Sequence, residues 1–432
     1  MAGAAGKQQW GSRLGFLMAA IGSAVGLGNL WRFPFQAGEN GGGAFVLIYI
    51  ACVFLIGYPV LIAELAIGRH KGLSAVGSAR NLAVDAGRSP NWQIVGWFGL
   101  GAAVLVLPSY AMISGQIMAY CVMGFMGDLG DSNVTPLYDG VVSSLLWFTA
   151  FLAVTTGIVL RGLKRGIEAA SVFLMPAFFL ILASLAAFAL FSGAASDALT
   201  YLFTPRFDQL TPEIVLAALG QALFSLGVGA GLMITYGSFL SKDESIGSNA
   251  LVVAGADTSV ALVAGLMIFP IVFVLGMNPA AGMGLIFGAL PSFFAGMPFG
   301  NLIGGAFFFL ATIAALTSSI AILMVSRTIG IEQFGLSERN ATLVFALLAW
   351  CGGIGIVWID GFANLLDWLV GSVFAPVGAL TVALLGGWVA PRSLMREELA
   401  QTSDWFFAFW RGSVRYAVPL AIVAILFAGL SG

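Results

Sequence analysis

The segment GSAVGLGNLWRFPF, from Gly22 to Phe35, decides the fold of this chain. It lies in an apolar stretch near 13–36, long enough to cross a membrane, which takes about 20 residues. Gly26 and Gly28 fall near its middle, and each helical glycine costs about 1 kcal/mol relative to alanine. Close packing against a neighbouring helix would also favour small residues here. The segment therefore predicts either a tightly packed membrane helix or a helix broken at Ser23–Gly28.

A second glycine cluster favours the broken helix. FSLGVGAG, from Phe224 to Gly231, lies in the sixth apolar stretch, so two five-span halves would place the two clusters at corresponding positions. Discontinuous helices at matching positions of inverted repeats are typical of the binding site of a secondary transporter. Unwound backbone at membrane depth must line protein or a water-filled cavity, because lipid cannot satisfy its polar groups. We therefore predict that the two breaks border one binding site.

The ends of the half-helices indicate what this site binds. Amide groups at a half-helix N-terminus suit a carboxylate, and freed carbonyl oxygens suit a hard cation. Ser23, Asn29 and Ser225 add polar side chains within the clusters. The pattern predicts a zwitterionic or carboxylated solute beside an alkali cation.

The composition excludes a water-soluble protein. Of the 432 residues, 59% are hydrophobic and 9% are charged, whereas a soluble domain has about 25% charged residues. We predict an all-α integral membrane protein with eleven transmembrane helices. They lie near 13–36, 43–68, 92–125, 142–160, 168–191, 213–239, 247–276, 299–331, 341–358, 361–389 and 405–430.

Lysine and arginine predict how the chain lies in the membrane. With the N-terminus in the cytoplasm, cytoplasmic segments hold all of the 18 Lys and Arg residues except Arg32 and Arg206, in line with the positive-inside rule. An odd number of spans then puts the C-terminus outside. We expect a multi-pass protein of the plasma or inner membrane with a cytoplasmic N-terminus.

The spans divide the chain into three parts. Residues 1–191 would form the first five-helix repeat, 192–390 the second, inverted repeat, and 391–432 the eleventh helix. The uncharged connection 277–298, rich in Gly, Pro and Phe, is either an external lid packed on the bundle or a short amphipathic connector.

Ionisable residues within membrane spans are costly and mark functional sites. The candidates are Arg32, Glu39, Glu64, Asp257 and Asp367. Asp257 has no lysine or arginine nearby in its span, so its partner is either a bound sodium ion or a proton. The hydroxyls of residues 317–319 either bond back to the preceding turn or supply cation ligands.

At these residues the chain resembles the neurotransmitter:sodium symporter family, especially its bacterial amino acid transporters. The resemblance extends over essentially the whole chain and rests on SAVGLGNLWRFPF followed by ENGGGAF, on QALFSLGVGAGLMITYGSF, and on TSSIAI in the eighth span. It implies two inverted five-helix repeats with broken helices 1 and 6. It also implies sodium-coupled symport of a neutral amino acid by alternating access.

The resemblance further implies which residues form the site. One sodium ion would be held by Ala24, Asn29, Ser225 and Asp257 together with the substrate carboxylate. A second sodium ion would be held by Gly22, Val25, Ala314, Thr317 and Ser318. The substrate would be bound by Ser23, Ala24, Gly26, Leu27, Gly28, Val106, Tyr110, Phe224, Ser225, Gly227, Ala230, Ser318 and Ile322.

Residues around the site are implied in the same way. Arg32 and Asp367 resemble the external gate pair of the family. Lys7 and Glu332 occupy the positions of the cytoplasmic gate, where arginine and aspartate are familiar. Glu64 is expected to support the site from outside the ligand contacts.

Two departures from the family pattern bear on the substrate. Gly227 stands where many relatives have serine, and Ala230 stands where a leucine-transporting relative has phenylalanine. Unless neighbouring side chains refill the space, both enlarge the pocket, so we expect a bulky hydrophobic or aromatic amino acid. Asp257 supplies a fixed negative charge beside the first sodium ion, so chloride is not expected.

Two other functions fit the same residues. One is a proton-coupled or sodium-independent amino acid carrier in which Asp257 titrates, and the other is an amino acid sensor that does not transport. An enzyme is not expected, because the sequence shows no nucleophile–base pair or metal cluster. The expected partners are the amino acid, two sodium ions and the lipid bilayer, without nucleic acid or a cofactor, in a monomer or dimer.

Overall fold

The computed structural model describes residues 9–129, 140–191, 194–274, 276 and 290–431. Lys7 therefore lies outside the described residues, and so does most of the predicted lid. Only residues 290–298 of the lid segment are described, and they contain the short helix α14 (Leu290–Ala295).

The described part of the chain is helical and contains no strand. The first five predicted spans correspond to α1 (Arg13–Ala24) with η1 (Gly28–Arg32) and α2 (Phe33–Glu39), α3 (Gly43–Cys52) with η2 (Val53–Gly57) and α4 (Tyr58–Lys71), η3 (Pro90–Gln93) with α6 (Ile94–Met126), α8 (Val141–Leu160), and η4 (Leu163–Glu168) with α9 (Ala169–Leu190). The next four correspond to α11 (Pro212–Ser225) with α12 (Leu232–Gly237), α13 (Ile246–Val274), α15 (Gly300–Phe334) and α16 (Glu338–Trp358). The last two correspond to α17 (Phe362–Trp368) with η7 (Leu369–Phe374), α18 (Ala375–Leu384) and η8 (Leu385–Val389), and to α20 (Asp404–Gly412) with η9 (Ser413–Ala417) and α21 (Val418–Ser431). Between spans lie α5 (Ala75–Asp85), α10 (Ala195–Phe203), η5 (Phe207–Gln209) and α19 (Arg392–Glu398).

Nine of the described helices are long and apolar enough to cross a membrane, and the bent pair 13–24 and 28–39 makes a tenth. The sixth predicted span is two short helices, and α11 alone has only 14 residues. The count of eleven depends on joining α11 to α12 and stays a prediction.

Both predicted breaks are present. The first span bends by 49° between α1 and the segment that starts at Gly28. In the sixth span, residues 226–231 leave the helix, with Gly229 at φ +88°. Only glycine adopts such a φ without strain, and a side chain at this position would collide with the Ala375 carbonyl of the tenth span. The glycines are therefore explained by unwound backbone and close packing together.

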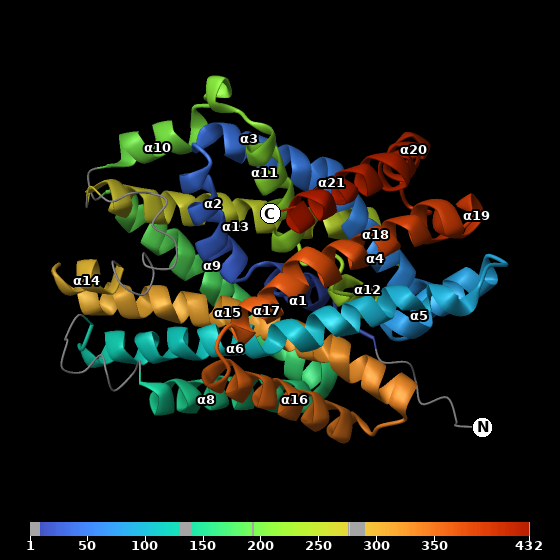
Figure 1. Ribbon diagram of the computed structural model, residues 1–432, viewed down its shortest axis with the longest axis horizontal. Coiled ribbons are helices and arrows are strands. Elements are labelled where there is room, and N and C mark those ends of the chain that lie inside the picture. Colours follow the sequence, from blue (N-terminus) through green and yellow to red (C-terminus); the bar gives the residue numbers. More distant parts are fainter. Residues whose placement is uncertain (1–8, 130–139, 192–193, 275, 277–289, 432) are drawn as a thin grey trace.

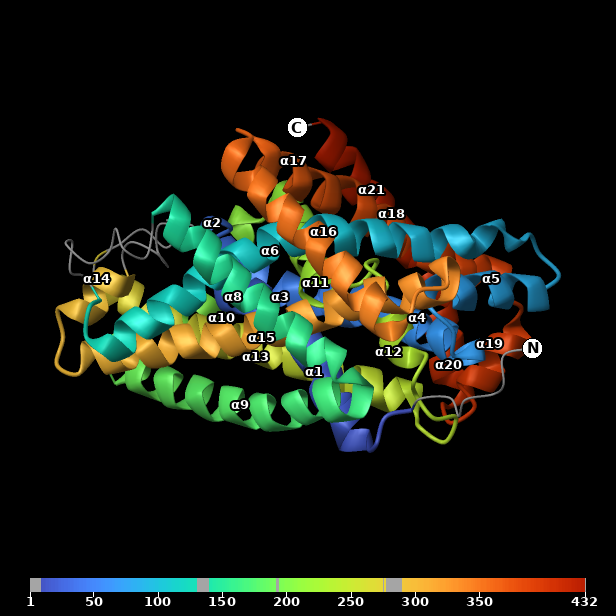
Figure 2. The ribbon, with the colours of Figure 1, turned by 90° about the horizontal axis from the view of Figure 1, so that it is seen from below.

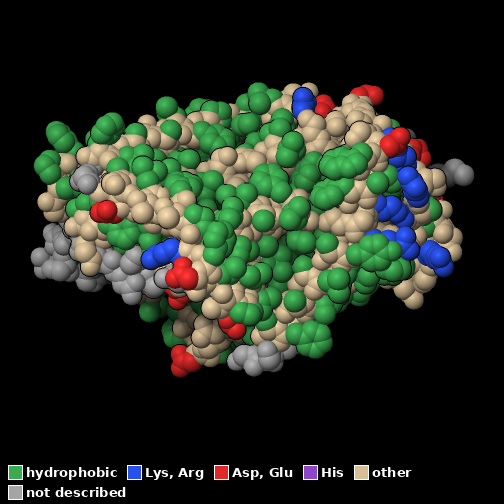
Figure 3. All heavy atoms as spheres, turned by 90° about the horizontal axis from the view of Figure 1, so that it is seen from above, with side chains coloured by type: hydrophobic (Ala, Val, Ile, Leu, Met, Phe, Trp, Pro, Cys, Tyr) green, Lys and Arg blue, Asp and Glu red, His purple; other side chains and the backbone are tan. Residues whose placement is uncertain are grey.

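The helices run mostly along the long axis of the molecule, with α15 beside α6 near the centre (Figures 1 and 2). The helices α5, α19 and α20 all lie at one end. Lysine and arginine side chains gather at this end, whereas hydrophobic side chains cover most of the remaining face (Figure 3). We call the end that holds α5, α19 and α20 the basic end. The positive-inside rule predicts that it faces the cytoplasm.

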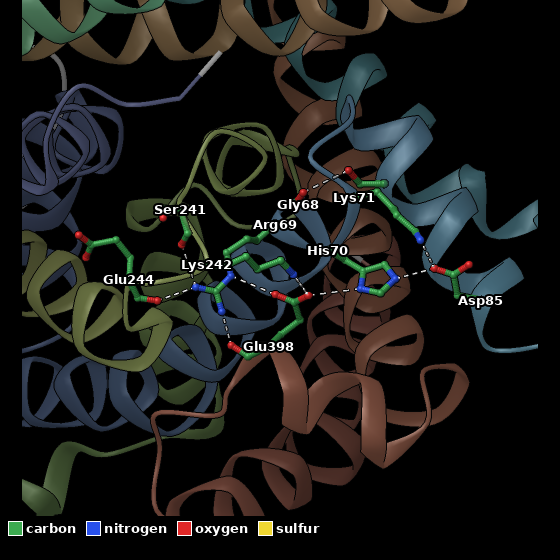
Figure 4. A network of polar contacts seen from close by, with 10 residues as sticks. Gly68, Arg69, His70, Lys71, Asp85, Ser241, Lys242, Glu244 and Glu398 are labelled. Carbon is green, nitrogen blue, oxygen red and sulfur yellow. Dashed lines mark hydrogen bonds and ion pairs between the residues drawn. The ribbon is translucent and has the colours of Figure 1, made fainter. Parts of the chain in front are cut away.

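A buried carboxylate ties several elements together at the basic end (Figure 4). Glu398 of α19 is 2% exposed and contacts Arg69 and His70 of α4 and Lys242, which follows α12. Its Oε2 lies 3.0 Å from Nε of Arg69. His70 also reaches Asp85 of α5, with 2.8 Å between Nε2 and Oδ2. The network joins the second span to the chain that leaves the broken sixth span.

Candidate functional site

A cavity of about 240 Å³ lies between the two breaks. Every residue that the sequence predicted to contact the substrate lines it: Ser23, Ala24, Gly26, Leu27, Gly28, Val106, Tyr110, Phe224, Ser225, Gly227, Ala230, Ser318 and Ile322. They come from the first, third, sixth and eighth spans, so the fold brings distant segments to one place.

The sequence reasoning missed one wall of this cavity. Residues of the tenth span, Val370, Gly371, Ala375, Pro376 and Ala379, line it, as do Arg32, Ala102, Gly220, Leu223, Val228, Leu232 and Ile425. Gly371, Ala375 and Ala379 are small residues spaced four apart, which places them on one helix face. This stripe, beginning in the π-helical segment η7, was the available signal.

The polar part of the cavity is formed by the broken first span. The Leu27 N–H lies 3.5 Å from the Tyr110 hydroxyl, and Gln221 donates to the Gly28 carbonyl at 3.0 Å. A side chain at Gly26 would come within 2.8 Å of the Ser318 hydroxyl and 3.0 Å of the Tyr110 hydroxyl. Glycine therefore leaves backbone, phenol and hydroxyl groups open to a polar ligand.

Phe224 and Arg32 form the mouth of the cavity. The Phe224 side chain is 47% exposed, and the Arg32 guanidinium carbon lies 4.1 Å from the centroid of its ring, a cation–π contact. Asp367 is exposed, and among the described residues no ion pair joins it to Arg32. The predicted external gate pair is not formed in this conformation, because Arg32 is directed at Phe224.

The predicted first sodium site contains a fully buried carboxylate. Asp257 accepts from Nδ2 of Asn29 at 2.7 Å, from the Ser225 hydroxyl at 2.7 Å and from the Tyr49 hydroxyl at 3.5 Å. Among the described residues, no lysine, arginine or histidine pairs with it. Tyr49, from the second span, was not predicted. A buried carboxylate held only by neutral donors requires a cation or a proton.

The Asn29 side chain would have to turn to bind sodium. Its amide nitrogen faces Asp257 and Ser225, whereas its oxygen Oδ1 accepts from the Gly26 N–H at 3.0 Å. The predicted role of Asn29 as an oxygen ligand therefore needs a rotation of the amide that releases Gly26.

The predicted second sodium ligands also converge. The Ser318 hydroxyl lies 3.4 Å from the Gly22 carbonyl, 3.5 Å from the Val25 carbonyl and 3.1 Å from the Ala314 carbonyl. The Thr317 hydroxyl lies 3.1 Å from the carbonyls of Ile313 and Ala314. Both hydroxyls thus bond back to the preceding turn of their own helix, which is one of the two alternatives that the sequence left open. Both residues also border the broken span. Five neutral oxygens at one place suit a hard cation.

Glu64 supports the break from the second span. It is fully buried, and its carboxylate accepts from the Gly229 N–H at 2.6 Å and the Met233 N–H at 3.2 Å. These are groups that the unwound segment and the start of α12 leave without helical partners.

The two predicted cytoplasmic gate residues have different outcomes. Glu332 accepts from the Ser74 N–H at 2.6 Å and thereby holds the start of α5. Lys7, its predicted partner, lies outside the described residues.

Trp10 packs against the sixth span at the basic end. Its indole N–H donates to the Tyr236 carbonyl at 3.1 Å, and its ring packs edge-on against Phe16, Tyr236 and Phe239. This contact joins the N-terminal segment to α12, the inner half of the sixth span.

Comparisons with known proteins agree with this geometry. A model of the "Sodium:neurotransmitter symporter family" matches residues 7–140 and 139–431. The chain is 36% identical to the uncharacterized sodium-dependent transporter YhdH of Bacillus subtilis and 30% identical to an uncharacterized sodium-dependent transporter of Haemophilus influenzae, in each case over 98% of both chains. Among solved structures it is similar to MhsT in complex with L-phenylalanine, with a TM-score of 0.89 and 36% identity over 98% of this chain and 100% of that one.

Proposed function

Because the chain belongs to the sodium:neurotransmitter symporter family, we propose that its cavity binds a neutral amino acid with a bulky hydrophobic or aromatic side chain. The family establishes the coarser function: the chain is a multi-pass membrane protein and a sodium-dependent amino acid transporter, not an enzyme. The proposal concerns the class of amino acid, the ions and the direction of transport.

The size and lining of the cavity support a large side chain. An apolar cavity of about 150 Å³ accommodates benzene, and about 240 Å³ leaves roughly 90 Å³ for the amino and carboxyl groups. Gly227 and Ala230 keep the sixth-span wall short, and Gly371 does the same on the tenth span. The L-phenylalanine bound to MhsT is consistent with such a pocket.

The arrangement of oxygen ligands supports two sodium ions. The first ion would lie at Asp257 beside the cavity, where the substrate carboxylate completes its coordination. Turning the Asn29 amide toward this ion would free the Gly26 N–H at the cavity wall, so ion and substrate would prepare the same segment. The second ion would join Gly22 and Val25 to the eighth span.

The contact of Trp10 with the inner half of the sixth span supports transport from outside to inside by alternating access. Trp10 holds the inner half of the sixth span while Phe224 and Arg32 border the opposite mouth. Substrate and sodium would enter past Phe224 and leave once the Trp10 contact opens. Asp257 provides the fixed charge that makes chloride unnecessary.

Uptake into proteoliposomes tests this function. The purified chain is reconstituted, and uptake of each of the twenty amino acids is measured with and without an inward sodium gradient and with chloride replaced by gluconate. We expect sodium-stimulated uptake that is strongest for aromatic or large aliphatic amino acids and unaffected by chloride. Strongest uptake of glycine or alanine would refute the proposed substrate class.

The same assay separates the two alternative functions. Uptake that follows a pH gradient without sodium would support titration of Asp257, whose partners among the described residues are all neutral donors. Tight binding without uptake of any amino acid would support a sensor.

A further inference from the structure

A second pocket, of about 220 Å³, opens at the basic end and shares no lining residue with the cavity between the two breaks. It lies between α19 and the start of the eleventh span, beside the end of the tenth span, and is lined by Arg392, Phe407, Ala408, Arg411, Gly412, Arg415 and Tyr416. Both spans are π-helical here, in η8 and η9, and such bulges are frequent at functional sites. None of these residues takes part in the proposed transport site.

The three arginines of this pocket have no acidic partner among the described residues. Arg411 donates to the Ala390 carbonyl at 2.9 Å and to the Gly386 carbonyl at 3.5 Å, at the end of η8. Arg392 is exposed, and Nε of Arg415 is buried without a hydrogen-bond acceptor. Three positive charges therefore share one small pocket without being neutralised.

The acidic residues of this segment are engaged elsewhere or face solvent. Asp404 pairs with Arg396 at 2.9 Å, and Glu398 belongs to the buried network with Arg69. Glu397 is exposed and forms no ion pair among the described residues. An anion from outside the chain is the remaining counter-charge for the pocket.

The rim of the pocket has the character of a membrane interface. Trp388 and Tyr416 are 49% and 55% exposed, and their rings pack edge-on with centroids 5.6 Å apart. The Arg415 guanidinium lies 4.2 Å from the Trp388 ring centroid. Trp405, nearby in the sequence, is 76% exposed. Tryptophan and tyrosine gather at the headgroup level of bilayers, so we expect this rim to lie at that level.

We propose that this pocket binds the phosphate headgroup of an anionic phospholipid. Arginine binds phosphate oxygens through two parallel N–H donors, and basic pockets between transmembrane helices are suited to anionic headgroups. The exposed apolar residues along the eleventh span, among them Phe409 and Leu420, would contact the acyl chains. A lipid fits both parts of this surface, whereas a soluble anion would use only the arginines.

Native mass spectrometry of the purified full chain tests this proposal. Binding of phosphatidylglycerol and of phosphatidylcholine with the same acyl chains is compared in the wild type, Arg392→Gln and an Arg411→Gln/Arg415→Gln double variant. We expect the wild type to prefer phosphatidylglycerol and each lost arginine to weaken that binding roughly fivefold. Arg392→Gln keeps the test valid if the double variant does not fold, because Arg392 is exposed and forms no ion pair in the described part of the chain.

Arg339→Gln is the matched control, since it removes an exposed arginine outside the pocket. If it weakens phosphatidylglycerol binding as much as Arg392→Gln, binding reflects overall charge and the proposal is wrong. Equal binding of both lipids would also overturn it. In a further arm, millimolar inorganic phosphate should displace little phosphatidylglycerol. Complete displacement would identify a soluble anion as the ligand instead.

Discussion

The carboxylate of Asp257 is the residue on which sodium binding depends most. It is fully buried and its described partners are neutral, so asparagine would remove the negative charge of this carboxylate while nearly preserving its shape. Removing a hydrogen-bonded charge costs about 1.5–3 kcal/mol. We expect Asp257→Asn to raise the sodium concentration for half-maximal uptake roughly 10- to 150-fold.

The control for this substitution is Asp197→Asn, which changes an exposed aspartate in α10. Its sodium titration should match the wild type. A wild-type titration in Asp257→Asn would remove this residue from the sodium site.

Ala230 is the residue on which the size of the substrate depends. It lines the cavity on the sixth span, and phenylalanine here would fill space that a large substrate needs. Overfilling a packed site costs about 1–3 kcal/mol. We therefore expect Ala230→Phe to weaken binding of aromatic amino acids about 5- to 150-fold in competition assays. Retained uptake of smaller amino acids would show that the variant is folded, whereas unchanged aromatic uptake would contradict the assignment.

Individual site residues could be predicted only where they lie in a recognisable motif. The residues around Gly26 and Phe224 stand in glycine clusters, and Asp257 stands out as a charge in an apolar span. Tyr49 could not be found in this way, because tyrosine is not unusual in a membrane helix, and the stripe of Gly371, Ala375 and Ala379 indicates a helix face but not the cavity that this face lines. Their place in the site follows from three-dimensional contacts, which depend on how distant spans pack.

The broken sixth span is the element whose geometry is most demanding. Gly229 has φ +88°, and a side chain would collide with the tenth span. An alanine in the left-handed region costs about 1–2 kcal/mol, before the tenth span is displaced. We expect Gly229→Ala to lower the unfolding temperature in detergent and to abolish most uptake.

Gly255→Ala serves as the control for this element. Gly255 lies within α13, and a side chain there would meet open space. Since alanine favours a helix, its unfolding temperature should stay the same or rise. Equal unfolding temperatures and equal uptake in the two variants would mean that stability and transport do not need the left-handed backbone at Gly229.

The elements themselves were largely predictable, because the length and hydropathy of a span follow from the bilayer. The two breaks were predictable from their glycines. The π-helical segments η7, η8 and η9 were not, because they depend on packing against other spans rather than on local composition. The division into two inverted repeats stays a prediction.

In the molecule as a whole, the Glu398 network should make stability depend on pH. Burial raises the pKa of Glu398, but the contacts with His70, Lys242 and Arg69 outweigh burial and lower it to about 2. Because its pKa is lowered, ionised Glu398 stabilises the fold at pH values above the ordinary glutamate pKa of about 4.5. This stabilisation is lost as the pH falls toward 2. The stabilisation at neutral pH is about 3 kcal/mol.

We therefore expect Glu398→Gln to lower the unfolding temperature at pH 7, and the difference from the wild type to shrink below about pH 4.5. Thermal unfolding in detergent across this range measures it. Glu397→Gln, which changes the exposed neighbour, should show no such trend. A difference that stays constant with pH would exclude the charge of Glu398 as its cause.

The opening of the basic end should depend on Trp10, because it joins the N-terminal segment to the inner half of the sixth span. Its indole donates to Tyr236 and packs against Phe16 and Phe239. Without these contacts the inner ends of α1 and α12 lose their mutual support, so the inward-open state becomes more populated. We expect Trp10→Ala to increase hydrogen–deuterium exchange in both segments and to lower sodium-driven uptake.

Trp405→Ala, which removes a 76% exposed tryptophan of the same end, should leave exchange in α1 and α12 unchanged. Because opening would disturb the Gly22 and Val25 carbonyls, high sodium should suppress the added exchange. Exchange that does not respond to sodium would separate the Trp10 contact from the proposed second sodium site.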